Sequence, residues 1–67
     1  MNDYGVFTTL ENGTEEWVID EEPLTLGSLE NAIDHWSYSD ACSVATYLTN
    51  SQGVSFAPGR PKDRQPK

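Results

Sequence analysis

The sequence predicts a small α+β domain in which an N-terminal β-hairpin and a short third strand form an antiparallel sheet packed on one main helix. Three observations predict this ββαβ arrangement. An Asn12-Gly13 pair separates two alternating segments, a helical apolar stripe follows Ser37, and a short β-type run follows that stripe. A chain of 67 residues makes one domain at most, because it buries only about 60% of its unfolded surface.

Residues 4–10 and 14–20 are the two predicted strands of the hairpin. Apolar side chains alternate with small or polar ones along both segments. Asn12-Gly13 between them is the strongest short-range hairpin signal, because a type I′ turn needs a positive φ at both central residues. Pro23 cannot donate a ladder hydrogen bond, so the second strand is expected to stop near Glu22.

A two-residue loop determines which side chains of the hairpin face the helix. It pairs Val6 with Ile19 and Phe7 with Val18, since the side-chain period of a strand is two. The face expected to meet the helix carries Tyr4, Val6, Leu10, Trp17 and Ile19. The face expected to be exposed carries Phe7, Thr9, Glu16, Val18, Asp20 and Glu22.

Residues 23–36 leave two interpretations open. Leu29, Ala32, Ile33 and Trp36 have helical spacing behind Ser28, which predicts an extra short helix at 28–36. Weak helix formers interrupt this window, so a helical turn that leads into an extended connection fits equally well.

Residues 38–49 are the predicted main helix. Ser37 can cap it with Asp40 as the acidic partner three residues later. One apolar stripe runs along the segment through Ala41, Val44, Ala45 and Leu48. Residues 50–53 end in glycine and supply the stop signal. The β-type run at 54–57 is then expected to add a strand beside the hairpin.

Residues 1–59 form the predicted domain, and residues 60–67 form a basic, Pro-rich tail. The tail has no apolar residue other than proline and no periodicity. It cannot bury enough surface to offset its ordering entropy, so we expect it to be disordered.

Charge is distributed very unevenly along the chain. Residues 1–59 contain ten Asp or Glu and no Lys or Arg, whereas all four cations lie in the tail. Like charge disfavours nucleic acid and anionic membranes as direct partners of the folded part. The expected partner is a larger protein with a Lys- and Arg-rich surface.

A soluble, cytoplasmic protein is expected from the rest of the composition. The N-terminal segment MNDYGVF lacks the features of a secretion signal, and no apolar run approaches the ~18 residues that a membrane span needs. The single Cys42 excludes an intramolecular disulfide framework.

Catalytic and cofactor chemistry find little support in the sequence. His35 follows Asp34, but no GxSxG elbow frames a serine nucleophile. Cys42 lies near a helix start without a second histidine or a cation to activate its thiol. There is no DxDxDG-like calcium loop and no glycine-rich phosphate loop. We therefore predict no enzyme activity, no cofactor and no metal site; a small hydrolase that uses His35 is the weakest alternative.

The exposed face of the hairpin is the candidate partner-binding surface. Carboxylates two residues apart on a strand are ~6.8 Å apart, close to two phosphate steps of ~3.4 Å along one DNA strand. A groove lined with Lys and Arg would accept such a row, with apolar anchors beside it. The predicted partner-binding residues are Phe7, Glu15, Glu16, Val18, Asp20, Glu21 and Glu22. An acidic surface that only confers solubility is the alternative.

The short acidic hairpin, the segments AIDHW, SYSDA and ATYL around one capped helix, and the polar tail resemble small proteins of phages and mobile elements. Anti-CRISPR proteins and other DNA-mimicking inhibitors are among them. The resemblance covers residues 1–59 in size, charge and layout. It implies a non-enzymatic inhibitor that blocks a nuclease or a nucleic-acid-binding complex by stoichiometric binding, in the host cytoplasm if it is phage-encoded. The alternative is a structural or regulatory interaction module, such as a homodimer formed through a strand edge beside Phe7 and Val18.

Overall fold

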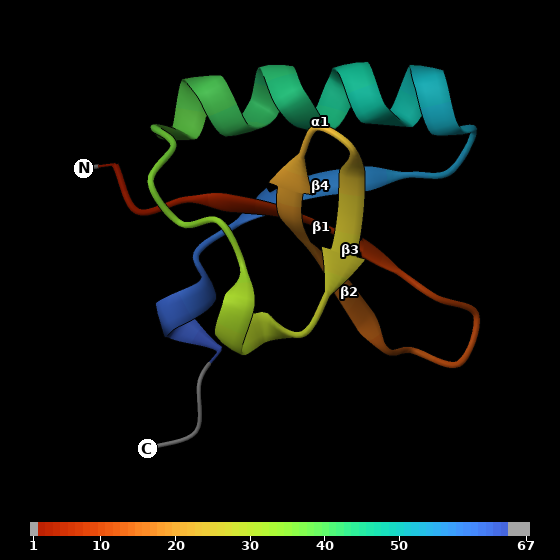
Figure 1. The fold of residues 1–67 in the computed structure, drawn as a ribbon, viewed down its shortest axis with the longest axis horizontal. Coiled ribbons are helices and arrows are strands. Elements are labelled where there is room, and N and C mark those ends of the chain that lie inside the picture. Colours follow the sequence, from red (N-terminus) through yellow and green to blue (C-terminus); the bar gives the residue numbers. More distant parts are fainter. Residues whose placement is uncertain (1, 65–67) are drawn as a thin grey trace.

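A computed structural model describes residues 2–64 and shows a four-stranded antiparallel sheet with one long helix across it (Figure 1). The elements are β1 (Gly5–Thr9), β2 (Glu15–Glu21), β3 (Leu24–Gly27), α1 (Tyr38–Gln52) and β4 (Phe56–Gly59), with short 3-10 turns η1 (Leu29–Asn31) and η2 (Pro61–Asp63). The strand order is β3-β2-β1-β4. The predicted α+β class is confirmed, and the sheet has one strand more than expected.

The helix begins and packs as its sequence predicts. The Ser37 hydroxyl accepts a hydrogen bond of 3.1 Å from the backbone N–H of Asp40, which satisfies one of the free donors at the helix start. Ala41, Ala45 and Leu48 form the buried stripe. The helix ends three residues later than expected, where Gly53 takes the left-handed conformation.

The strand after the helix lies beside the hairpin, as predicted, and pairs with β1, but it starts at Phe56, two residues later than expected. Two side-chain hydrogen bonds position this strand. The Thr49 hydroxyl accepts a hydrogen bond of 2.9 Å from the backbone N–H of Phe56. The buried Thr8 hydroxyl donates one of 2.7 Å to the carbonyl of Ser55. Because β4 is an edge strand, Pro58 within it leaves no ladder partner unsatisfied.

The first hairpin has a three-residue loop that ends at Gly13, one residue longer than predicted. Leu10 donates to the carbonyl of Thr14 at 2.8 Å, and Gly13 has a φ of 88°. A glycine with positive φ in the third loop position is typical of such loops. Phe7 therefore lies opposite Trp17, and the predicted register is wrong by one residue.

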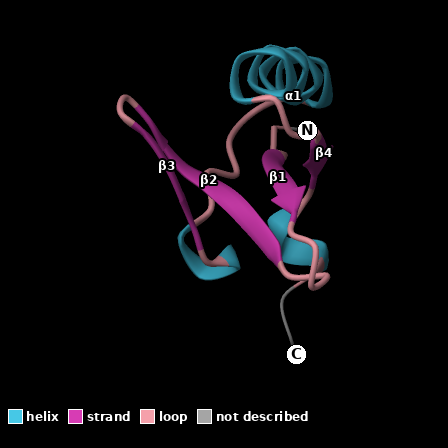
Figure 2. Cartoon of the chain, turned by 90° about the vertical axis from the view of Figure 1, so that its right-hand side faces the viewer, coloured by secondary structure: helices cyan, strands magenta, loops and turns pink. Residues whose placement is uncertain are grey.

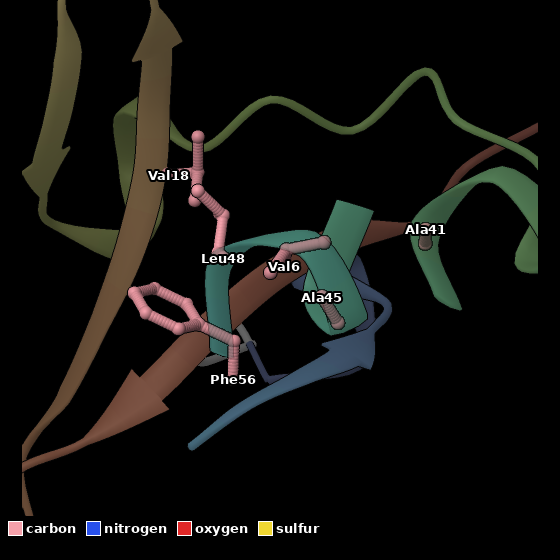
Figure 3. Packing of buried hydrophobic residues seen from close by; sticks show 6 residues of the cluster. All are labelled: Val6, Val18, Ala41, Ala45, Leu48 and Phe56. Carbon is pink, nitrogen blue, oxygen red and sulfur yellow. The ribbon is translucent and has the colours of Figure 1, made fainter. Parts of the chain in front are cut away.

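This one-residue shift exchanges the two faces of β2 relative to the prediction. Val18 faces α1 and is fully buried, as is Val6. Trp17 is also buried, but on the face opposite the helix, and Leu10 is 42% exposed. The core that α1 covers consists of Val6, Val18, Ala41, Ala45, Leu48 and Phe56 (Figure 3).

Residues 23–36 form a strand and a helical turn rather than a helix. β3 pairs antiparallel with β2, and the cis peptide Glu22-Pro23 lies in the turn between them. After η1 the chain runs without further helix to an isolated bridge between Trp36 and Tyr4. The predicted helix over 28–36 is wrong, and the alternative of a helical turn followed by a connection is confirmed.

Residues 60–64 fold back on the sheet face opposite α1, and we call them the C-terminal strap (Figure 2). Pro61 is buried in η2. An ion pair of 2.7 Å joins Arg60 to Asp3, and the Arg64 guanidinium lies 4.8 Å from the ring centroid of Phe7. The prediction of a disordered tail is therefore wrong for residues 60–64. Its remaining residues, 65–67, lie outside the described part of the chain.

Gly5 is expected to tolerate no side chain. A Cβ there would clash with the backbone carbonyl of Ile33 and press on Pro61 of the strap. The substitution Gly5→Ala is therefore expected to lower the free energy of unfolding by about 1–3 kcal/mol, the usual cost of overpacking. Urea denaturation measures this change. Gly27→Ala is the matched control, because its Cβ would meet only the Ile19 side chain, which can move. Equal losses in both variants would contradict the close approach at Gly5.

Candidate functional site

Strand pairing separates the carboxylates that were predicted to form one row. Val18 pairs with Leu26, whereas Asp20 pairs with Thr25, because a β-bulge intervenes in β2. Thr25 and Leu26 are neighbours and face opposite sides of the sheet, so Asp20 faces away from Val18. Glu16 lies on the same face as Val18. The predicted row through Glu16 and Asp20 is therefore wrong, since a bulge reverses the alternation.

Neither predicted apolar anchor lies on an open surface. Val18 is 0% exposed within the helix-side core. Phe7 is half-buried on the other face, where its ring centroid lies 4.8 Å from that of Trp17 and the Arg64 guanidinium covers it. The two side chains point to opposite faces, so the apolar patch expected for an inhibitor surface or a homodimer does not exist.

The cations of the strap pair with carboxylates near both ends of β1. Arg64 Nε lies 3.1 Å from Glu15 Oε1. Arg60 and Lys62 both approach Asp3, at 2.7 and 3.6 Å. Glu15, one of the predicted partner-binding residues, is therefore engaged within the chain.

The cations of the strap lower the pKa of the Asp3 carboxyl group. Burial alone would raise the pKa of Asp3, but the hydrogen bond and charge of Arg60, together with the charge of Lys62, hold the pKa below its ordinary value. The same hydrogen bond raises the pKa of Arg60. The ion pair therefore favours the charged form of both groups.

Asp3→Asn is expected to lower the free energy of unfolding at pH 7. In acid, the difference between wild type and variant should disappear. Because the pKa of Asp3 is lower when folded than when unfolded, its carboxylate stabilises the fold above an unfolded pKa of about 3.9. That contribution disappears as the pH falls through the lowered pKa. Urea denaturation at several pH values measures it, with Asp34→Asn as the control because Asp34 is exposed. A gap between wild type and Asp3→Asn that does not narrow below about pH 4 would contradict this role.

Most carboxylates have no cationic partner among residues 2–64. Of the eleven Asp and Glu, only Asp3, Glu15 and Asp63 lie within 4.0 Å of an Arg or Lys nitrogen in residues 2–64. The other eight are Glu11, Glu16, Asp20, Glu21, Glu22, Glu30, Asp34 and Asp40. Self-repulsion among these groups is therefore not relieved by the described part of the chain.

Three of the unpaired carboxylates are consecutive at the turn between β2 and β3. We call Asp20, Glu21 and Glu22 the acidic tip. All three residues are exposed. The Asp20 carboxylate accepts a hydrogen bond of 3.2 Å from the backbone N–H of Glu22, which helps to set the shape of the turn. The predicted partner-binding residues Asp20, Glu21 and Glu22 are thus consecutive at the end of β2 and the start of the turn, and they do not share one strand face.

An apolar pocket lies beside the acidic tip, between the second hairpin and α1. The helix packs on β1 and β4, and the β2–β3 hairpin extends away from it (Figure 2). The bulge in β2 brings Glu21 to the side of the sheet that Val18 occupies. The pocket has a volume of about 250 Å³. We call it the hairpin–helix pocket. The residues that line it are Val18, Glu21, Leu24, Ser43, Val44, Tyr47 and Leu48.

Leu24, Ser43 and Tyr47 line the pocket but were not identified from the sequence. Tyr47 is 69% exposed. It lies about one helical turn after Val44, and both residues line the pocket. The signal was present, because Val44, Tyr47 and Leu48 have the i, i+3, i+4 spacing of one helix side. Leu24 became part of the pocket only through β3, which the sequence did not predict.

The residues considered for catalysis do not form a site. His35 and Asp34 are both exposed, and the imidazole contacts Trp36, with 5.8 Å between ring centroids. Cys42 is a half-buried free thiol on α1. Its hydrogen bond and charge raise the pKa of the neighbouring Tyr38 phenol. These contacts are local and do not bring His35 to a nucleophile.

Within residues 2–64, no helix is both long and apolar enough to cross a membrane. In the same part of the chain, no three His, Cys, Asp or Glu side chains gather closely enough to hold a metal ion. Comparison of the chain with protein-family models, with curated proteins and with solved structures finds no match.

Proposed function

We propose that the protein is a non-enzymatic inhibitor or modulator that binds a basic, nucleic-acid-binding surface of a larger protein in the cytoplasm. Its mode of action would be that of anti-CRISPR proteins and other DNA-mimicking inhibitors. The observation that carries the proposal is the set of eight carboxylates without a cationic partner in residues 2–64. A basic partner would relieve the self-repulsion that these groups create.

The acidic tip is the centre of the proposed surface. Asp20, Glu21 and Glu22 are exposed and adjacent, whereas Glu15 is engaged by Arg64 and Glu16 lies near the other end of β2. A partner that carries Lys and Arg would be attracted over several ångströms, so association should be fast and strongly weakened by salt.

Affinity capture from the cells that make the protein tests this proposal. The wild-type chain is compared with Asp20→Asn/Glu21→Gln/Glu22→Gln and with a matched variant that neutralises three carboxylates elsewhere, Glu11→Gln/Glu30→Gln/Asp34→Asn. We expect wild type and matched variant to retain a nucleic-acid-binding protein, and the tip variant to lose it. Circular dichroism is used to check that all three chains are folded.

Equal retention by all three chains would contradict a role of the acidic tip. Retention that does not fall between about 50 and 200 mM salt would contradict an electrostatic interface, since exposed charges are screened in this range. A captured protein without any nucleic-acid-binding surface would overturn the proposed class of target.

A further inference from the structure

The hairpin–helix pocket has the dimensions of a side-chain site. Its volume is about 250 Å³, below the ~300–1,000 Å³ typical of pockets for cofactors and drug-sized ligands. It is open to solvent at one side because α1 packs mainly on β1 and β4, which leaves part of the β2–β3 hairpin uncovered (Figure 2). A single apolar side chain of a partner is the kind of group that fits it.

The pocket has a buried apolar floor and an exposed aromatic rim. Val18 and Leu48 form the floor and are 0% and 6% exposed. Leu24 and Val44 are half-buried, and Tyr47 stands at the opening. An exposed tyrosine beside a desolvated apolar pocket is typical of the residues that dominate the binding energy of protein interfaces.

The negative charge at the opening favours a partner with Lys or Arg next to the inserted side chain. Glu21 lines the pocket itself, and Glu22 follows it in the turn, whereas the side chain of Asp20 lies on the other side of the sheet. None of the three has a cationic partner among residues 2–64. Lys or Arg beside an inserted apolar residue would be attracted by Glu21 and by the neighbouring Glu22, because opposite charges across an interface favour one register.

We infer that the hairpin–helix pocket receives one apolar side chain from a partner segment in which Lys or Arg flanks that side chain. The inference rests on the proposed function and deepens it, since it names the recognition element that charge alone does not provide. A second copy of this chain is a poor occupant. Residues 1–59 contain no Lys or Arg, and Arg60 and Arg64 of the strap are already paired with Asp3 and Glu15.

Two synthetic peptides test the inference on the full ¹⁵N-labelled chain at low salt. One has the sequence Lys-Arg-Leu-Arg-Lys, and in the other serine replaces the leucine. We expect the leucine peptide to shift the amide signals of Glu21, Leu24, Val44 and Tyr47. Its binding should be roughly tenfold tighter than that of the serine peptide, as burial of one leucine side chain would give.

Two tyrosine variants of α1 distinguish the contribution of the pocket to binding from that of the surrounding charge. Tyr47→Ala is expected to reduce the affinity for the leucine peptide several-fold and to leave that for the serine peptide unchanged. Tyr38→Ala is the matched control, because Tyr38 is also an exposed tyrosine on α1 but lies outside the pocket. Equal effects of the two variants on the leucine peptide would overturn the inference.

The remaining outcomes distinguish the pocket from the proposed function. Equal affinity for both peptides, with shifts confined to the acidic tip, would overturn the pocket and leave the acidic interface intact. Absence of binding by both peptides would overturn the pocket, and the capture experiment decides the proposed function independently. Shifts that depend on protein concentration without peptide would identify a second copy as the occupant and overturn the inference.

Discussion

Replacing Val18 by Asp is expected to unfold the protein, whereas the same change at Val54 should leave it folded. Val18 is 0% exposed in the core beneath α1, and Val54 is 52% exposed. An unpaired carboxylate at Val18 would add a desolvation cost of several kcal/mol to the lost packing. A domain of this size has a total stability of only about 3–10 kcal/mol. At Val54 the cost should stay within about 0.5 kcal/mol.

Urea denaturation and the dispersion of amide NMR signals measure both variants. Val18→Asp should show collapsed dispersion in buffer, and Val54→Asp should retain the wild-type spectrum. If Val18→Asp were as stable as Val54→Asp, the three-residue loop and its register would be wrong. Val18 would then lie on an exposed face, as a two-residue loop requires.

Replacing residues 60–64 by glycine and serine is expected to lower the free energy of unfolding by about 2–4 kcal/mol. The change removes buried Pro61, which accounts for about 1 kcal/mol or more. It also removes the Arg64 guanidinium from the Phe7 and Trp17 rings, where contacts of this kind contribute about 0.5–2 kcal/mol. The partly exposed ion pair between Arg60 and Asp3 adds little to this sum, because solvent screens it.

Solvent exchange of the Trp17 indole N–H, together with urea denaturation, measures the loss of the strap. We expect this proton to exchange faster in the variant, because the strap covers the ring. Lys62→Ala is the control, since Lys62 is a strap cation with a side chain 60% exposed. Unchanged stability and exchange in the strap variant would mean that residues 60–64 do not cover the sheet.

The helix and the strand that follows it are predicted by local signals. Ser37, Asp40 and the stripe through Ala41 and Leu48 are close in sequence, so capping and periodicity predict the helix directly. The short strand after the helix was likewise expected beside the hairpin. Such elements need no knowledge of distant contacts.

The register of the first hairpin was not determined by its turn residues. Asn12-Gly13 fits both a two-residue and a three-residue loop, and only Gly13 takes a positive φ among these residues. One residue of difference moves Val18 from the surface to the core. The bulge in β2 then reverses the alternation again before Asp20. As a result, Glu16 and Asp20 lie on opposite faces and do not form the predicted row of carboxylates.

The strap was missed because its contacts are remote in sequence. Arg60 and Asp3 are separated by 57 positions, and Arg64 and Glu15 by 49. The local composition of residues 60–64 predicts disorder, but Pro61 is buried next to Gly5, and the Arg64 guanidinium lies over the Trp17 ring. The hairpin–helix pocket was missed for a related reason, because it depends on β3 and on the bulge.

Occupation of a nucleic-acid-binding surface is tested most directly by competition for the protein that the wild-type chain captures. The anisotropy of a labelled nucleic acid bound to that partner is followed as this chain is added at constant salt. The wild-type chain and Glu11→Gln/Glu30→Gln/Asp34→Asn should displace the nucleic acid at one molecule per site, and Asp20→Asn/Glu21→Gln/Glu22→Gln should not. A ternary complex that holds the partner, its nucleic acid and the wild-type chain together would contradict the proposal.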